Sequence, residues 1–255
     1  MAGIGSAWQA RLIQGGFIAA LLLLWDFVGQ QRIVSPILLP ALRAVFWKFT
    51  ALVQTSALYT HLGVTLFELI SAFLIASALG LSIGYLIGRS RYAASVFEPL
   101  LASVFAVPII IFLPIFLLFF GIGPLSKIAF GATYAFFPIV LNTIGGIGQV
   151  DARYVRVARA MGADDYQMFR RVLLPAALPV IVTGLRIGCI IGFLSIIGSE
   201  MIAGFQGLGS QIVRLGEGMN TPEMFAYIVF VIFFAILLNL GLTALEKRFA
   251  IPGAA

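Results

Sequence analysis

The sequence predicts an all-α, polytopic membrane protein with about six transmembrane helices. Hydrophobic residues make up 61% of the 255 residues and charged residues only 10%, whereas a soluble domain carries about 25% charged residues. Apolar runs of about 20 residues recur along the chain, which is the length that a helix needs to cross a bilayer. Helices are expected because a spanning helix satisfies its backbone hydrogen bonds internally.

The residue inventory excludes several other classes of protein. The net charge is +6, but no basic stripe interleaved with aromatic residues is present, so no nucleic acid is expected as a partner. The single cysteine, Cys189, and the single histidine, His61, cannot build a disulfide framework or a metal site. Cys189 is interpreted as a small buried apolar residue because it lies inside an apolar run.

The first span is predicted over about residues 12–29, after Arg11. No small-residue cleavage site precedes the next polar segment, so we interpret the run as a retained span and not as a signal peptide. Residues 30–60 follow and contain an amphipathic stretch with Arg43 and Lys48 on its polar side. This stretch is predicted to lie along the membrane interface.

Five further apolar runs complete the set, at about residues 62–88, 96–120, 125–147, 177–203 and 224–245. We therefore expect an N-terminal helix with its amphipathic segment, a main transmembrane domain and a short tail, at residues 1–59, 60–248 and 249–255. Ten lysines and arginines fall on the side of the termini and the 151–176 loop, and five fall on the other side, with Arg186 left out because it lies inside a span. The positive-inside rule places both termini and this loop in the cytoplasm.

Two spans carry small residues at four-residue spacing, a pattern that allows close helix packing in lipid. The rows are Ala72, Ala76, Gly80, Gly84 and Gly88 in the second span, and Gly184, Gly188 and Gly192 in the fifth. Packing within one subunit is favoured over a subunit interface.

Prolines interrupt the third and fourth spans. The third contains Pro108 and Pro114, and the fourth contains Pro138 followed by Asn142. A proline removes a helix hydrogen bond, which membrane helices tolerate where they are buried in protein or line a wet cavity. We interpret these positions as pathway-lining or hinge elements, with a plain kink as the alternative.

Charges in or near the spans are candidates for function, because such groups are costly in a membrane. Asp26 and Glu200 lie near the predicted outer ends, where solvation is the simple explanation. Glu68 and Arg186 lie deeper, and one hypothesis pairs them with each other. The glycine-rich segment 198–215 is interpreted as a re-entrant or surface turn at the outer mouth, since no strand precedes it as in a nucleotide-binding loop.

The longest polar interruption, Asp151–Pro179, contains five arginines and three aspartates. Asp151 is predicted to cap a helix that ends near Met161, where Gly162 can adopt a positive φ. The apolar face of this helix carries Tyr154, Ala158 and Met161.

A second helix is predicted from the pair Asp164 and Gln167, which has the spacing of a capping box. Pro175 is expected to end or bend it. Two short helices with apolar faces and many arginines indicate a docking surface on the cytoplasmic side.

The loop resembles that of binding-protein-dependent ABC transporter permeases. Their signature is Glu-Ala-Ala, three residues, Gly, nine residues and Ile-x-Leu-Pro. Gly162 matches the glycine, Ala158 the second alanine and 172–175 (VLLP) the final element, with valine for isoleucine. Arg156 replaces the glutamate and Val157 replaces the first alanine.

Further motifs resemble the branch of this family that handles sulfonates, taurine, nitrate and bicarbonate. They are SPILLP (35–40), IGRSR (87–91), FGIGPLSKI (120–128), FFPIVLNT (136–143), RRVLLPAALPVIVTGLR (170–186) and GLGSQI (207–212). The resemblance covers residues 35–248 and implies the type I ABC importer permease fold in a bacterial inner membrane.

The resemblance also implies the partners. A second permease subunit, expected to be another copy of this chain, would complete the pore, and two ABC ATPase subunits would dock on the 151–175 loops. An extracytoplasmic substrate-binding protein would deliver the solute. ATP would be used by the ATPase, because this chain has no Walker-type GxxxxGK[ST] sequence and is expected to bind no cofactor.

The resulting site prediction has two parts, and neither contains a catalytic residue or a metal ligand. The coupling loop is expected to act through Arg156, Ala158, Arg159, Met161, Gly162, Ala163, Leu174 and Pro175. The candidate pathway or hinge residues are Pro108, Pro114, Pro138, Asn142, Arg186 and Glu200.

The expected cargo is a small organic or oxyanionic solute such as a sulfonate, taurine or nitrate, with an aromatic acid or vitamin precursor as the alternative. A secondary transporter driven by an ion gradient would require intramembrane acids and inverted repeats, yet only Glu68 is a deep acid and no repeat is evident. A membrane-embedded enzyme is disfavoured because the spans hold no catalytic cluster.

Overall fold

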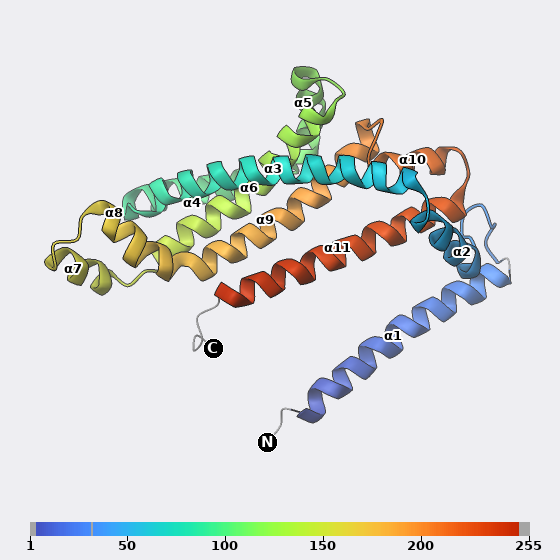
Figure 1. Ribbon diagram of the computed structural model, residues 1–255, viewed down its shortest axis with the longest axis horizontal. Coiled ribbons are helices and arrows are strands. Elements are labelled where there is room, and N and C mark those ends of the chain that lie inside the picture. The colour runs from blue at the N-terminus through green and yellow to red at the C-terminus, as the bar shows by residue number, and fades with distance from the viewer. Residues whose placement is uncertain (1–3, 32, 250–255) are drawn as a thin grey trace. The chain divides into compact units, whose positions relative to one another are not determined.

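The computed structural model describes residues 4–31 and 33–249, and over these ranges the chain is helical without a β-strand (Figure 1). The α-helices are α1 (Ile4–Gln30), α2 (Leu42–Val53), α3 (Ser56–Gly88), α4 (Arg91–Phe105), α5 (Leu113–Phe120), α6 (Pro124–Gly148), α7 (Ala152–Ala160), α8 (Asp165–Met168), α9 (Leu174–Ala203), α10 (Leu208–Glu217) and α11 (Thr221–Phe249). A 3-10 helix, η1 (Ile109–Phe112), precedes α5, and a π-helix, η2 (Phe169–Leu173), precedes α9.

The predicted spans correspond to helices of the structure. Within the described ranges, five helical segments are long and apolar enough to cross a membrane, and a sixth span exists if a bent pair of helices is counted as one. That pair is the predicted span 96–120, which divides into Arg91–Phe105 and Ile109–Phe120 with a bend of 75°. The predicted interruption of the third span by its prolines is therefore confirmed, as a break between two helices. Pro108 adopts an extended conformation at the break, and Pro114 lies in the first turn of α5.

The chain forms two compact units. One comprises the described residues up to Tyr59 together with Gln211–Ile232, and the other comprises Thr60–Ser210 together with the described residues from Phe233 onward. In the first unit, the Trp25 indole donates a hydrogen bond of 3.0 Å to the carbonyl of Pro40 and its ring packs against Phe225. Helix α2 is amphipathic as predicted, with Val45 buried and Lys48 exposed.

The core of the second unit is built around α6. Figure 1 shows α3 and α9 running alongside this helix, and both rows of small residues pack against it. A Cβ atom added at Gly80 would lie 2.7 Å from Ile139, and one added at Gly188 would lie 2.6 Å from the same side chain. The rows therefore serve packing within one chain, as predicted, because only glycine allows these backbones to approach so closely.

The predicted second loop helix does not end at Pro175. Helix α8 passes through the π-helix Phe169–Leu173 directly into α9, whose first turn contains Pro175. Of the two alternatives, that Pro175 ends the helix is wrong, because helical backbone continues through it; the hydrogen bonding departs from the α pattern just before the proline, in the π-helix Phe169–Leu173. The loop is thus joined to α9 by continuous helical backbone.

Candidate functional site

The loop at residues 151–175 begins with a capped helix, as the sequence predicted. The Asp151 carboxylate accepts hydrogen bonds from the backbone N–H and the Nε of Arg153, at 2.8 and 2.9 Å. These bonds hold the pKa of Asp151 below its ordinary value. The carboxylate therefore remains charged at neutral pH, and the N-terminus of α7 keeps its cap.

The turn after α7 depends on Gly162, which adopts φ = +81°. This is the left-handed region, where glycine has no Cβ to clash. Two residues later, Asp164 and Gln167 form the predicted capping box: the Asp164 carboxylate accepts from the Gln167 N–H at 2.7 Å, and the Gln167 side chain accepts from the Asp164 N–H. Local chemistry therefore sets the geometry of the whole turn.

Helix α7 presents two different faces. Tyr154, Val157 and Met161 expose 65%, 59% and 83% of their surface, although all three are large apolar residues outside the membrane spans. The opposite face carries Arg156 and Arg159, which line a cavity. Sequence reasoning placed Ala158 on the apolar face and did not include Val157, which the spacing from Tyr154 could have indicated.

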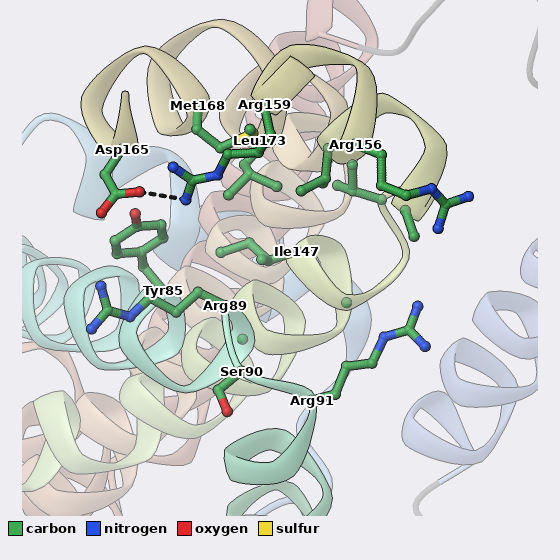
Figure 2. Close-up of a pocket in the computed structure, with 15 residues that line it drawn as sticks. Tyr85, Arg89, Ser90, Arg91, Ile147, Arg156, Arg159, Asp165, Met168 and Leu173 are labelled. Carbon is green, nitrogen blue, oxygen red and sulfur yellow. Dashed lines mark hydrogen bonds and ion pairs between the residues drawn. The ribbon is translucent and has the colours of Figure 1, made fainter. Parts of the chain in front are cut away.

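The cavity, here called the arginine pocket, has a volume of about 470 Å³ and lies between α7, the α3–α4 turn and the α6–α7 turn (Figure 2). Its charged lining residues are Arg89, Arg91, Arg156, Arg159 and Asp165. Its apolar lining includes Ile147, Val155 and Leu173.

Only one arginine of the pocket has an acidic partner. Arg159 forms an ion pair with Asp165. In the described part of the chain, no carboxylate lies within ion-pair distance of Arg89, Arg91 or Arg156. Figure 2 shows Arg91 and Arg156 extending toward the same edge of the pocket, away from the Arg159–Asp165 pair.

The remaining predicted coupling residues lie along the same loop. Ala163 and Leu174 are half-buried, whereas Pro175 is exposed. Leu174 begins α9, which places the end of the loop signature at the start of a membrane-spanning helix.

Deep inside the second unit, Glu68 pairs with Lys127 and not with Arg186. The Glu68 Oε1 lies 3.7 Å from the Lys127 Nζ, and both side chains are almost completely buried. The hypothesis of a Glu68–Arg186 pair is therefore wrong. The sequence analysis counted Lys127 among the five basic residues on the outer side, although residue 127 falls inside the predicted span 125–147. Its position within a span could have indicated that Lys127 is buried and needs an acidic partner.

Glu200 is also buried, with no exposed surface, so the expectation that it is solvated is wrong. Its two oxygens accept hydrogen bonds from the Thr65 hydroxyl and from the Gly209 N–H, each at 2.7 Å. Thr65 in turn accepts from the Leu208 N–H at 3.0 Å. Glu200 thereby joins α3 and α9 to the N-terminus of α10, where an acidic group is favourable.

Arg186, on α9, contacts the C-terminal part of α11. Its Nε lies 2.8 Å from the Glu246 Oε2, and Thr183 donates a hydrogen bond to the same carboxylate. The last span was predicted to end at about residue 245, whereas α11 extends past Glu246 to Phe249. Arg186 is therefore engaged in a link between α9 and α11.

The proline of the fourth span lies in a continuous helix. Asn142 donates a 2.8 Å hydrogen bond to the Pro138 carbonyl, and a Cβ added at Gly184 would lie 3.1 Å from that carbonyl. Pro138 and Asn142 thus lie where α6 approaches α9 closely, at Gly184. Within the described residues, no group of three or more His, Cys, Asp or Glu side chains could hold a metal ion.

Comparison with known proteins agrees with this arrangement. Residues 76–251 match the family described as the inner membrane component of binding-protein-dependent transport systems. The chain belongs to this family. Its members are permease components and not enzymes, so the chain is an ABC importer permease of the inner membrane.

Two relatives come from the branch that the sequence motifs indicated. The taurine transport system permease protein TauC of Escherichia coli (strain K12) is 32% identical over 238 residues, covering 91% of this chain and 86% of its own length. The putative aliphatic sulfonates transport permease protein SsuC of Bacillus subtilis (strain 168) is 33% identical over 211 residues, covering 83% of this chain and 76% of its own.

Among solved structures, the MetNI methionine ABC transporter in an inward-facing conformation resembles this fold. The TM-score is 0.62 at 22% sequence identity, covering 74% of this chain and 94% of the other. This similarity identifies the type I importer permease fold.

Proposed function

We propose that this permease conducts a sulfonate-type organic anion across the inner membrane and is driven by an ATPase docked on residues 151–175. The solute class is supported by the similarity of nearly the whole chain to taurine and aliphatic sulfonate permeases. ATP is consumed by the partner, which this chain engages from the cytoplasm.

The observation that carries the proposal is the apolar face of α7. Exposed apolar residues outside a membrane span are costly in water, and such a patch marks an interaction surface. Tyr154, Val157 and Met161 form it on a helix that is capped at its start by Asp151 and stopped by Gly162. A rigid, short amphipathic helix is the kind of element that seats in a groove of a partner.

The connection from the loop to the membrane supports a lever mechanism. Because α8, η2 and α9 are continuous, a displacement of the loop acts directly on α9 without an intervening flexible linker. Helix α9 packs on α6 through Gly184 and Gly188, so it moves against a rigid neighbour. Closure of the ATPases would in this way bias the permease between its inward-open and outward-open states.

The full assembly that we propose contains two copies of this chain, two ATPase subunits and an extracytoplasmic substrate-binding protein. Both termini and the 151–175 loop lie in the cytoplasm in this assignment, which rests on the excess of lysine and arginine on that side.

Docking is tested by placing a charge on the apolar face. Tyr154→Asp and Met161→Asp are each expected to lose the ATPase during affinity purification of the tagged permease. Tyr92→Asp, at an exposed tyrosine outside the loop, is the matched control and should retain the ATPase. Co-purification of the ATPase with both loop variants at the level of the control would contradict the proposal.

The solute is tested with the reconstituted importer and its own binding protein. Uptake of radiolabelled taurine or of a short alkanesulfonate is expected, and an excess of unlabelled sulfonate should compete. Transport of an aromatic acid or a vitamin precursor without competition by any sulfonate would assign the alternative cargo.

A further inference from the structure

The arginine pocket has a charge that its own residues do not balance. Four arginines and one aspartate line it, and the aspartate is already paired with Arg159. Arg89, Arg91 and Arg156 are therefore left without a carboxylate partner in the pocket, and Figure 2 shows Arg91 and Arg156 on one side of it and Arg89 extending to the other. Like charges gathered in one cavity repel each other, so an anion that enters it stabilises the arrangement.

The other loop arginines, Arg153, Arg170 and Arg171, lie outside this pocket. Arg153 pairs with Asp151, and Arg170 donates a 3.0 Å hydrogen bond to the Tyr166 hydroxyl. An excess of lysine and arginine on one side of the membrane does not by itself place arginines from two separate parts of the chain beside one cavity. Arg89 lies in the α3–α4 turn, Arg91 begins α4 and Arg156 lies on α7.

Backbone groups add to the positive potential. Ser90 is the N-cap of α4 and lines the pocket, whereas the start of α7 is already capped by the Asp151 carboxylate. The N-terminus of a helix carries a partial positive charge and unpaired N–H groups, which favour an anion. The apolar wall formed by Ile147, Val155 and Leu173 reduces the local screening by water.

We propose that the arginine pocket binds a tetrahedral oxyanion, namely a phosphate group. Guanidinium groups present several N–H donors in one plane and bind phosphate oxygens in pairs. The group comes either from inorganic phosphate in the cytoplasm or from the headgroup of an anionic phospholipid. Arg156 is central, because this position is a glutamate in the loop signature that the chain resembles, and a glutamate there would remove two units of positive charge.

Binding is measured on the full-length permease without an ATPase, so its failure is separate from failure of the proposed coupling. The first arm is equilibrium dialysis of radiolabelled inorganic phosphate against the protein in nanodiscs of phosphatidylcholine. The second arm is native mass spectrometry after addition of phosphatidylglycerol, with phosphatidylcholine as the reference lipid. Saturable binding in the first arm alone identifies a free anion, and selective binding in the second alone identifies a lipid headgroup.

Three variants locate the site. Arg156→Glu is expected to weaken binding at least about tenfold, because it removes a charge-assisted contact and adds a repelling carboxylate. Arg156→Gln is the milder variant if the first does not fold, and it should weaken binding by a smaller factor. Arg171→Ala is the matched control, since it removes an arginine of the same loop that lies outside the pocket.

Two results would overturn the proposal. One is the absence of saturable binding of either probe to the wild-type protein. That result would indicate that the arginines of the pocket pair with an acidic group of the docked ATPase instead of an oxyanion. The other is an equal loss of binding in Arg171→Ala and in the Arg156 variants, which would indicate general attraction to a basic surface.

Discussion

The carboxylate of Glu68 lies 3.7 Å from the ammonium group of Lys127, and 0% and 4% of the two side chains are exposed. The pair joins α3 to the first turns of α6, where the Lys127 Nζ also donates to the Gly123 carbonyl at 3.3 Å. Glu200 lies buried in the same unit and organises the start of α10. The second unit thus contains buried polar groups, and each of them contacts a defined polar partner.

Removing one member of the buried pair should be severe. Lys127→Ala leaves the Glu68 carboxylate buried without its counter-charge, and we expect a loss of about 3–5 kcal/mol of stability. The double variant Glu68→Gln with Lys127→Met should recover much of that loss. Thermal unfolding of the purified protein in detergent provides the measurement.

The control for this prediction is the surface pair Lys48–Glu223, at 3.5 Å with both side chains partly exposed. Lys48→Ala should change stability by about 1 kcal/mol or less. Equal effects of Lys48→Ala and Lys127→Ala would show that the buried pair has no special role.

Substitution of Gly188 should disturb the packing of α9 on α6. A Cβ at this position would lie 2.6 Å from Ile139 and 2.9 Å from the Ala135 carbonyl, so Gly188→Val requires a backbone shift. We expect a loss of at least about 1–3 kcal/mol, measured by thermal unfolding. Gly145→Ala is the control, since nothing lies within 4 Å of its added Cβ and the helix should be slightly stabilised.

Gly162→Val should separate ATP hydrolysis from uptake. The space around Gly162 is open, so the cost arises from φ = +81° and amounts to about 1–2 kcal/mol for an ordinary residue. The loop would relax its turn and misplace α7. Uptake per ATP hydrolysed by the reconstituted importer provides the measurement.

Asparagine tolerates the left-handed region better than valine, so Gly162→Asn is the matched variant for this position. It should retain most of the coupling. A fully coupled Gly162→Val complex would show that the positive φ is dispensable.

Glu200→Gln should loosen the turn between α9 and α10. The amide oxygen can accept from the Gly209 N–H and the NH₂ group can donate to the Thr65 oxygen, but the Thr65 O–H then loses its acceptor and both charge-assisted bonds become neutral, at a cost of about 1–2 kcal/mol. Faster hydrogen exchange is expected at residues 204–210. Glu217→Gln, at an exposed glutamate of α10, is the control, and identical exchange in both variants would refute the role of Glu200.

Much of the fold followed from local pattern. The lengths of the apolar runs predicted the membrane helices, because the thickness of the hydrocarbon core alone sets that length. The Asp151 cap, the capping box at Asp164 and the positive φ of Gly162 were predicted for the same reason: each depends on backbone geometry within one turn.

Tertiary structure decided the features that join separate segments. The partner of Glu68, the burial of Glu200 and the gathering of Arg91 and Arg156 in one cavity depend on how each helix is rotated against its neighbours, which no single segment specifies. The prolines predicted an interruption of the third span, but the angle of 75° and the packing of Ile109 and Leu113 against Phe130 and Phe137 of α6 are features of the tertiary structure. The sequence also could not predict that the loop continues into α9 as helix, because Pro175 is compatible with both the end and the first turn of a helix.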